Sequence, residues 1–99
     1  MIVKGKTSDG FAFEYDAERL DDMRLVDVIA EASAPNASDF ARAHGASVLL
    51  TMILGAELKA ALYEHIGKSH DGRVPQAALE AALTEIMATA GGKDAVKNS

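Results

Sequence analysis

The segment Val48–Leu54 restricts the fold of this chain more than any other feature, because almost all of its residues are apolar. It reads Val-Leu-Leu-Thr-Met-Ile-Leu, and Thr51 is its only polar residue. A helix that is apolar nearly all round lies either at the centre of a core or in an interface. Aromatic residues make up only 5% of the chain, so aliphatic residues and Met must form the core, a mixture that favours helices. The sequence therefore predicts a mainly helical domain in which this segment is central to the core or to an interface.

Four helices are predicted from capping residues and from breaks in the apolar pattern. We expect them over residues 21–32, from near Asn36 or Ser38 to Leu54, over 56–66, and from Pro75 up to about Gly91. Asp21 or Asp22 is a suitable N-cap for the first helix, and Pro75 suits the first turn of the fourth. The buried face of the fourth helix is predicted to consist of Leu79, Leu83, Ile86 and Met87.

Two glycines bear on these helix boundaries. Gly45 lies inside the second predicted helix, where it costs about 1 kcal/mol relative to Ala, so a kink or a break remains an alternative there. Gly67 directly follows the third predicted helix. Because Gly readily adopts the left-handed conformation that ends many helices, we expect it to be the C-terminal cap.

The first fifteen residues predict a β-hairpin rather than a helix. The runs Ile2–Lys6 and Phe11–Tyr15 flank a Thr-Ser-Asp-Gly turn signal. The aromatic side chains of the second run then share one face, which has to pack on the helices because an isolated hairpin is marginally stable. The predicted fold class is mainly α (α+β), with an N-terminal hairpin packed on a bundle of about four short helices. We assign residues 1–90 to this single domain and residues 91–99 to a flexible C-terminal tail.

Charge and composition argue against several classes of function. The net charge is −5, and residues 1–40 hold nine acidic residues against four basic ones. No cluster of Lys and Arg occurs, so we expect no nucleic-acid partner; the acidic half is either a solvated face or a complement to a basic partner. No apolar run reaches the roughly 18 to 20 residues of a membrane span, and Met1–Lys6 lacks the apolar core of a signal peptide. Without Cys, disulfides and thiolate metal sites cannot form. We expect a cytoplasmic protein with no membrane partner.

No pattern of reactive residues predicts an enzyme or a metal site. The segment Gly67–Pro75 has the look of the middle of an EF-hand loop, but Gly67 and Ala78 occupy the positions at which calcium needs carboxylates. His65 and His70 are separated by the predicted end of a helix, so they do not share one face as zinc-binding pairs do. We therefore expect no enzymatic activity, no catalytic residue, no metal and no cofactor.

A protein-binding role is the remaining hypothesis, and the apolar segment supplies its candidate residues. These are Val48, Leu49, Met52 and Ile53. If the segment lies in the core, it needs no further function. If part of it is exposed, it is a docking surface for a partner protein or for a second copy of the chain. Both alternatives remain open from the sequence.

Two neighbouring motifs resemble a known family. Ile53–Ile66 reads Ile-Leu-Gly-Ala-Glu-Leu-Lys-Ala-Ala-Leu-Tyr-Glu-His-Ile, and Asp71–Pro75 reads Asp-Gly-Arg-Val-Pro. They resemble the tail assembly chaperones of long-tailed (siphovirus-type) bacteriophages and prophages. In that family a Leu-rich helix ends in Leu-Gly, a Leu-x-x-Leu helix follows, and a turn of this type leads to a last helix rich in Leu, Ile and Met. Leu79–Met87 occupies the place of that last helix, and Leu20–Asp27 is similar to the start of the family's first helix. Gly45 departs from the family's pattern.

The resemblance implies a viral protein that acts as a chaperone in the host cytoplasm and is absent from the mature virion. Its implied partners are the tape measure protein and the tail tube protein, which it would bind during tail assembly. Such chaperones are commonly also made in a longer form by ribosomal frameshifting. The alternative is a small helical adaptor or regulatory module that binds some other protein.

Overall fold

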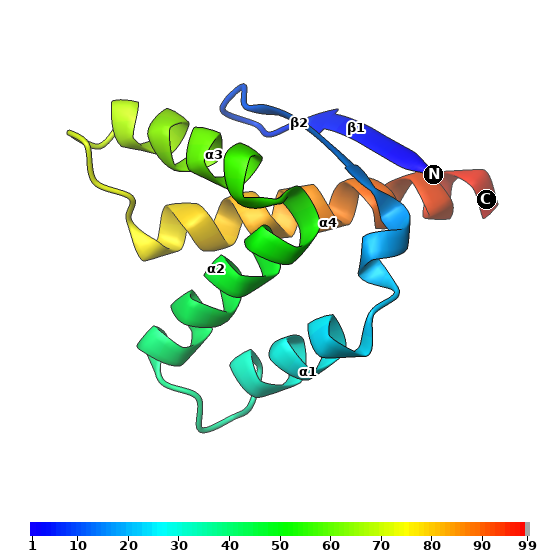
Figure 1. Cartoon of the computed structure of the whole chain (residues 1–99), viewed down its shortest axis with the longest axis horizontal. Helices are drawn as coiled ribbons and strands as arrows, with labels where there is room; N and C mark the ends of the chain where they lie inside the picture. The colour runs from blue at the N-terminus through cyan, green and yellow to red at the C-terminus, as the bar shows by residue number, and fades with distance from the viewer. Residues whose placement is uncertain (99) are drawn as a thin grey trace.

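An N-terminal hairpin followed by four α-helices makes up the computed structural model of this protein, which describes the backbone of residues 1–98 and the side chains of residues 1–89 (Figure 1). The elements are β1 (Ile2–Lys6), β2 (Ala12–Asp16), the short 3-10 helix η1 (Ala17–Leu20), α1 (Met23–Ala32), α2 (Asp39–Leu54), α3 (Ala56–Lys68) and α4 (Gln76–Asn98). The predicted α+β class is confirmed. None of the described helices is both long enough and apolar enough to cross a membrane.

The two strands form an antiparallel ribbon whose inner face is apolar. Val3 pairs with Tyr15, and the side chains of Val3, Phe11, Phe13 and Tyr15 are buried. The Tyr15 hydroxyl donates a hydrogen bond of 2.9 Å to the backbone carbonyl of Ile86 in α4. This contact and the apolar face hold the ribbon against the helices, as the aromatic alternation of the second strand predicts.

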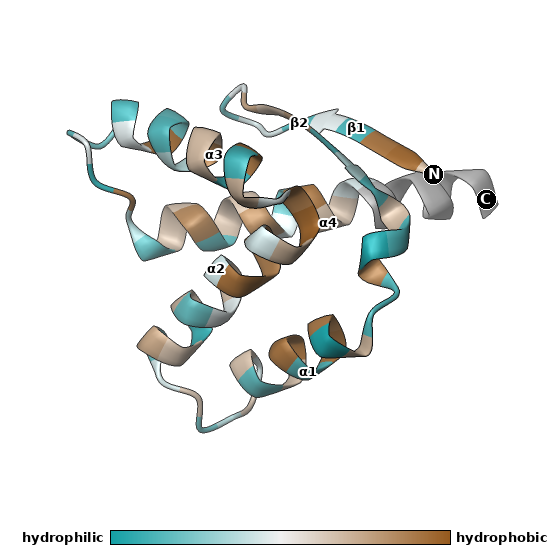
Figure 2. Ribbon diagram, in the orientation of Figure 1, coloured by the Kyte–Doolittle hydropathy of each residue, from teal (hydrophilic) through white to brown (hydrophobic). Residues whose placement is uncertain are grey.

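Helix α2 lies at the centre of the core. It packs against α1, α3, α4, β2 and η1, and Figure 2 shows hydrophobic residues concentrated in its C-terminal half. Leu50 and Ile53 are 0% exposed, and Leu49 and Leu54 are also buried. Of the two places predicted for an apolar helix, the structure therefore places this one in the core.

Caps fix where the first two α-helices begin. The Asp22 side chain accepts a hydrogen bond of 2.9 Å from the backbone N–H of Arg24, and the Ser38 hydroxyl accepts one of 3.0 Å from that of Ala41. The prediction of an Asp cap for the first helix is confirmed, with Asp22 as the capping residue. The short helix η1, which precedes this cap, was not predicted.

Two glycines behave differently from the predictions. Gly45 neither breaks nor ends α2; it is buried where a Cβ atom would come within 2.7 Å of the Ala32 Cβ, so it allows α1 to approach closely. Gly67 is not the cap of α3, which continues to Lys68. In the loop that follows, the left-handed residues are Asp71 (φ 56°) and Gly72 (φ 85°); a Cβ atom at Gly67 would make ordinary van der Waals contact with the backbone of Gly72, at 3.5 Å.

The fourth helix begins at Gln76, one residue after the Pro75 that was predicted for its first turn, and its described apolar residues face the core. Leu79 and Ile86 are buried, and Leu83 and Met87 pack against the same cluster. Its backbone continues past Gly91, at which the sequence predicts its end. The side chains of the predicted flexible tail, residues 91–99, lie outside the described part of the chain. The flexibility of this tail stays a prediction.

The close contact at Gly45 provides a test of this packing. Gly45→Ala should lower the free energy of unfolding by about 1 kcal/mol or more, because overpacking outweighs the roughly 1 kcal/mol that Ala gains in helix propensity. Adding Ala32→Gly removes the opposing methyl group and should restore much of the loss. Urea unfolding followed by circular dichroism measures both values. A stabilised single mutant would show that α1 does not approach α2 as closely as described.

Candidate functional site

The structure separates the four predicted binding residues into two pairs. Leu49 is 4% exposed and Ile53 is 0% exposed, so both belong to the core. Val48 and Met52 are half-buried and lie on the side of α2 that faces the start of α1. Of the four, Val48 and Met52 therefore offer the larger exposed surface, and a binding role for any of them stays a prediction.

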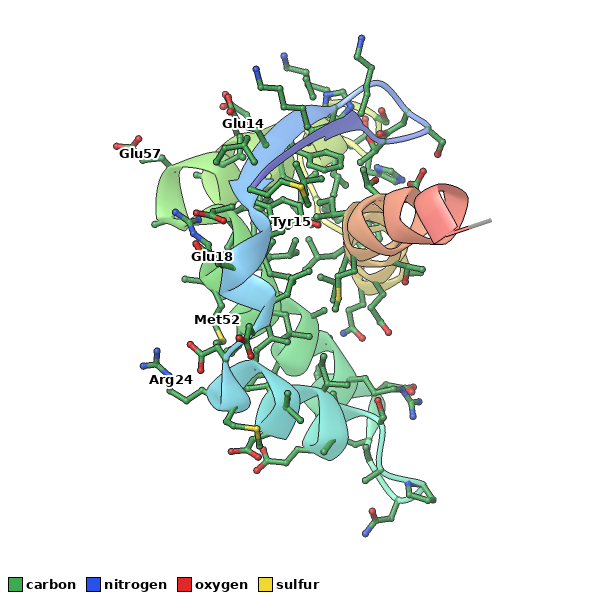
Figure 3. All side chains as sticks on the ribbon, turned by 90° about the vertical axis from the view of Figure 1, so that its right-hand side faces the viewer. Glu14, Tyr15, Glu18, Arg24, Met52 and Glu57 are labelled. Carbon is green, nitrogen blue, oxygen red and sulfur yellow. The ribbon has the colours of Figure 1, made fainter. Side chains whose placement is uncertain are left out.

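Val48 and Met52 border an open hollow of about 440 Å³, here called the Met52 hollow. Its lining consists of Arg19, Asp22, Arg24, Val28, Val48 and Met52. In Figure 3, Met52 lies between Glu18 and Arg24 on one side of the molecule. The hollow thus has an apolar floor from α1 and α2, and charged side chains from η1 and the first turn of α1 surround it.

The charged groups at this rim are fixed by the backbone and by each other. The Arg24 guanidinium binds the Asp22 carboxylate through Nη2 at 2.8 Å and Nε at 3.1 Å. The side-chain hydrogen bonds from Arg24, and then the bond from its backbone N–H, hold the pKa of Asp22 below its ordinary value of 3.8. Arg19 donates a hydrogen bond of 2.8 Å from Nη1 to the carbonyl of Ile53, near the C-terminus of α2.

The chemistry of the hollow suits the binding of an apolar side chain. Val28, Val48 and Met52 offer only aliphatic and thioether surface. Met is unbranched and flexible, so it adapts to partners of different shape. The surrounding Arg and Asp residues are already paired or bonded to the backbone, as a polar rim around an apolar contact commonly is.

Exposed apolar side chains concentrate around the same two helices. The exposed large hydrophobic residues are Met1, Ile2, Met23, Val26 and Phe40. Met23 and Val26 are on α1, and Phe40 is in the first turn of α2. The sequence interpretation did not single them out, although Met23 and Val26 fall outside the inward stripe of the first helix, a signal that could have marked them.

A polar cluster joins α2 to α3, and the sequence interpretation missed it. The Lys59 ammonium donates to the Ser47 hydroxyl at 2.6 Å and to the Thr51 hydroxyl at 2.9 Å. The Tyr63 hydroxyl also donates to Ser47, at 3.2 Å. The sequence signal for this cluster is two pairs at i, i+4 spacing, Ser47 with Thr51 and Lys59 with Tyr63, on either side of Leu54-Gly55. A Ser beside a Lys can be a nucleophile and its base, but here the bonds run between two helices, and we interpret the cluster as their link.

The histidines are distributed over separate places in the fold. His44 is exposed on α2. His65 contacts Asp9 at 3.5 Å and lies against the Phe11 ring, while His70 Nδ1 is 2.8 Å from the carbonyl of Ile66. Within the described residues, no three His, Asp or Glu side chains are grouped so as to hold a metal ion.

Comparison of the chain with protein-family models, with curated proteins and with solved structures found no match.

The Asp22 carboxylate gives the rim a specific pH dependence. Because its pKa is lowered in the folded protein, its contribution to stability is complete above the ordinary pKa of 3.8 and is lost as the pH falls through the lower folded value. The first turn of α1 should therefore open in acid as the carboxylate loses its hydrogen bonds to Arg24. Carboxyl 13C shifts give the pKa of Asp22, and amide exchange reports on the first turn of α1.

The matched control for this titration is Asp22→Asn, which keeps a capping side chain but has no charge to lose. In this variant, amide protection in the first turn of α1 should stay constant across the pH range in which Asp22 titrates in the wild-type protein. An Asp22 that titrates at or above its ordinary value would contradict the described rim.

Proposed function

We propose that this chain is a tail assembly chaperone of a long-tailed bacteriophage or prophage, acting on the tape measure protein and the tail tube protein in the host cytoplasm. The proposal takes its partners from the resemblance at Ile53–Ile66 and Asp71–Pro75. The observation that carries a protein-binding role is the exposure of Met23 and Val26 on α1 and of Phe40 on α2, together with the apolar floor of the Met52 hollow. Such surface is typical of sites that bind other proteins.

The residues that carry the resemblance have structural positions in this fold. Leu54-Gly55 forms the junction of α2 and α3, where Gly55 has a φ of 85°. Asp71 and Gly72 supply the left-handed turn from which the chain proceeds to Pro75 and α4. These motifs support the proposal by specifying a scaffold. The scaffold holds α1 and α2 in position. In our proposal, the partner binds the surface that these two helices form.

The Met52 hollow should be the contact site for the tape measure protein. We expect Met52→Asp to weaken binding of purified tape measure fragments by about tenfold or more, because a carboxylate would have to be buried against an apolar partner. Isothermal titration calorimetry measures the affinity, and circular dichroism verifies the fold. Met52→Leu should bind nearly normally, since it keeps the volume and the apolar character.

Two further variants separate contact from folding. Ala61→Asp introduces the same charge at an exposed position of α3 and should leave binding unchanged. Leu49→Asp places a carboxylate in the core and should reduce helicity as well as binding. Folded wild-type protein that binds neither tape measure nor tail tube fragments would refute the chaperone proposal and favour the adaptor alternative.

A further inference from the structure

Helix α1 is apolar on two sides, and only one of them is used inside the molecule. Leu25, which is buried, and Val28 belong to the side that packs on α2. Met23, Val26 and Ala30 follow i, i+3, i+7 spacing and form a second, exposed stripe. Met23 is 68% exposed and Val26 is 46% exposed. We call this stripe the outer face of α1.

The outer face continues into a second hollow, between α1, α2 and α4. This hollow has a volume of about 250 Å³. Its apolar lining includes Ile29 from α1, Leu49 from α2, and Leu83 and Met87 from α4. Figure 1 shows α1 beside α2 at the edge of the molecule, on the side opposite the hairpin. Because Ile29 follows Val26 by three residues, the two side chains are neighbours on α1, and the apolar lining of the hollow adjoins the outer face.

The charges around this surface favour a cationic partner. Asp27 and Glu31 are exposed on α1 beside the stripe, and Glu80 of α4 lines the hollow. In the part of the chain with described side chains, none of these three acids forms an ion pair. Arg42 also lines the hollow, but it is paired with Asp39, as the neighbouring Arg24 is with Asp22. The uncompensated charge at the rim is therefore negative.

We propose that the outer face of α1 and the adjoining hollow bind an amphipathic helix of a partner protein whose apolar stripe is flanked by Lys or Arg. This inference rests on the proposed protein-binding function: it adds a second contact for the same partner, in addition to the Met52 hollow, and names the chemistry of that partner. A helix supplies anchors at i, i+3, i+4 and i+7, which match the spacing of the outer face, and its basic flanks would face Asp27, Glu31 and Glu80.

A second copy of the chain fits this surface less well. If two outer faces packed antiparallel around a twofold axis, the midpoints of the two helices would meet there. The midpoint of α1 is at Asp27 and Val28, so the two Asp27 carboxylates would lie near each other. Like charges placed together in an interface are unfavourable. Charge thus selects a basic helix over self-association.

Two synthetic peptides test the inference directly. Both are helical, about 18 residues long, with the same Leu stripe; one has Lys on either side of the stripe and the other has Glu. We expect the Lys peptide to bind about tenfold or more tightly than the Glu peptide, measured by fluorescence anisotropy. Amide shifts in 15N spectra should change in α1 and around Leu83 and Met87.

Variants of the chain show whether the named residues are responsible. Asp27→Lys with Glu31→Lys should reverse the preference, so that the Glu peptide binds more tightly. The control, Glu57→Lys with Glu64→Lys, makes the same charge change at exposed positions of α3 and should leave the preference unchanged. Met23→Gln with Val26→Gln should weaken the binding of the Lys peptide by about fivefold or more, whereas Ile2→Gln, at an exposed position of β1, should not.

Three outcomes would overturn the inference. Equal binding of the two peptides would remove the charge argument, and shifts confined to another face would place the site elsewhere. A concentration-dependent dimer that Met23→Gln with Val26→Gln dissociates would show that a second copy covers the face.

The tape measure fragments separate this inference from the proposed function. Fragments whose binding ignores the Asp27 and Glu31 substitutions would refute the inference and leave the chaperone function standing. Lys-peptide binding at α1 without any binding of tape measure or tail tube fragments would support the inference and refute the chaperone function.

Discussion

The burial of α2 is the constraint on which the rest of the fold depends. Leu50 and Ile53 are 0% exposed, and this helix contacts elements on nearly every side. Because the chain has no Trp and few aromatic residues, an aliphatic helix has to supply the centre of the core. The aromatic side chains of the hairpin then cover it, which explains why a two-stranded ribbon that is marginal by itself is stable here. With the centre occupied in this way, a binding function has to use the helices at the periphery.

Much of the fold could be predicted because its signals are local. The hairpin follows from a turn sequence between alternating residues, and the caps at Asp22 and Ser38 satisfy backbone N–H groups within their own helices. The glycines could not be assigned in this way. Gly45 is explained by Ala32, which lies in another helix, and the left-handed turn after α3 falls at Asp71 and Gly72 rather than at Gly67. Helix propensity counts each glycine as a cost to the helix that contains it. Contacts with other parts of the chain, which propensity does not include, determine where a glycine is needed.

The candidate site could be predicted only in part for the same kind of reason. A segment with apolar residues on all sides has no periodicity that distinguishes its exposed members from its buried ones. Val48 and Met52 reach the surface because α1 covers only one side of α2, and Leu49 and Ile53 do not because α4 and the hairpin complete the core around them. The exposure of Met23 and Val26 was not predicted, because an apolar residue on a helix is first assigned to the core. Only the position of α1 in the fold leaves these two side chains uncovered.

The same arrangement makes α1 the helix best placed to respond to a partner. Leu25 is its only buried residue, and η1, which precedes it, has none. Full burial of one Leu side chain contributes about 1.5 to 3 kcal/mol, and the partly buried Ala17, Leu20, Val28 and Ile29 add to it, so residues 17–32 have fewer fully buried side chains than α3 or α4. Elements with few buried contacts open at lower free energy than the rest of a protein. A partner that covers Met23 and Val26 would add apolar burial to the element that has least of it, and binding to the folded form alone stabilises that form. Binding at α1 is therefore expected to be coupled to the ordering of the α1–α2 pair, while the hairpin, α3 and α4 remain as they are.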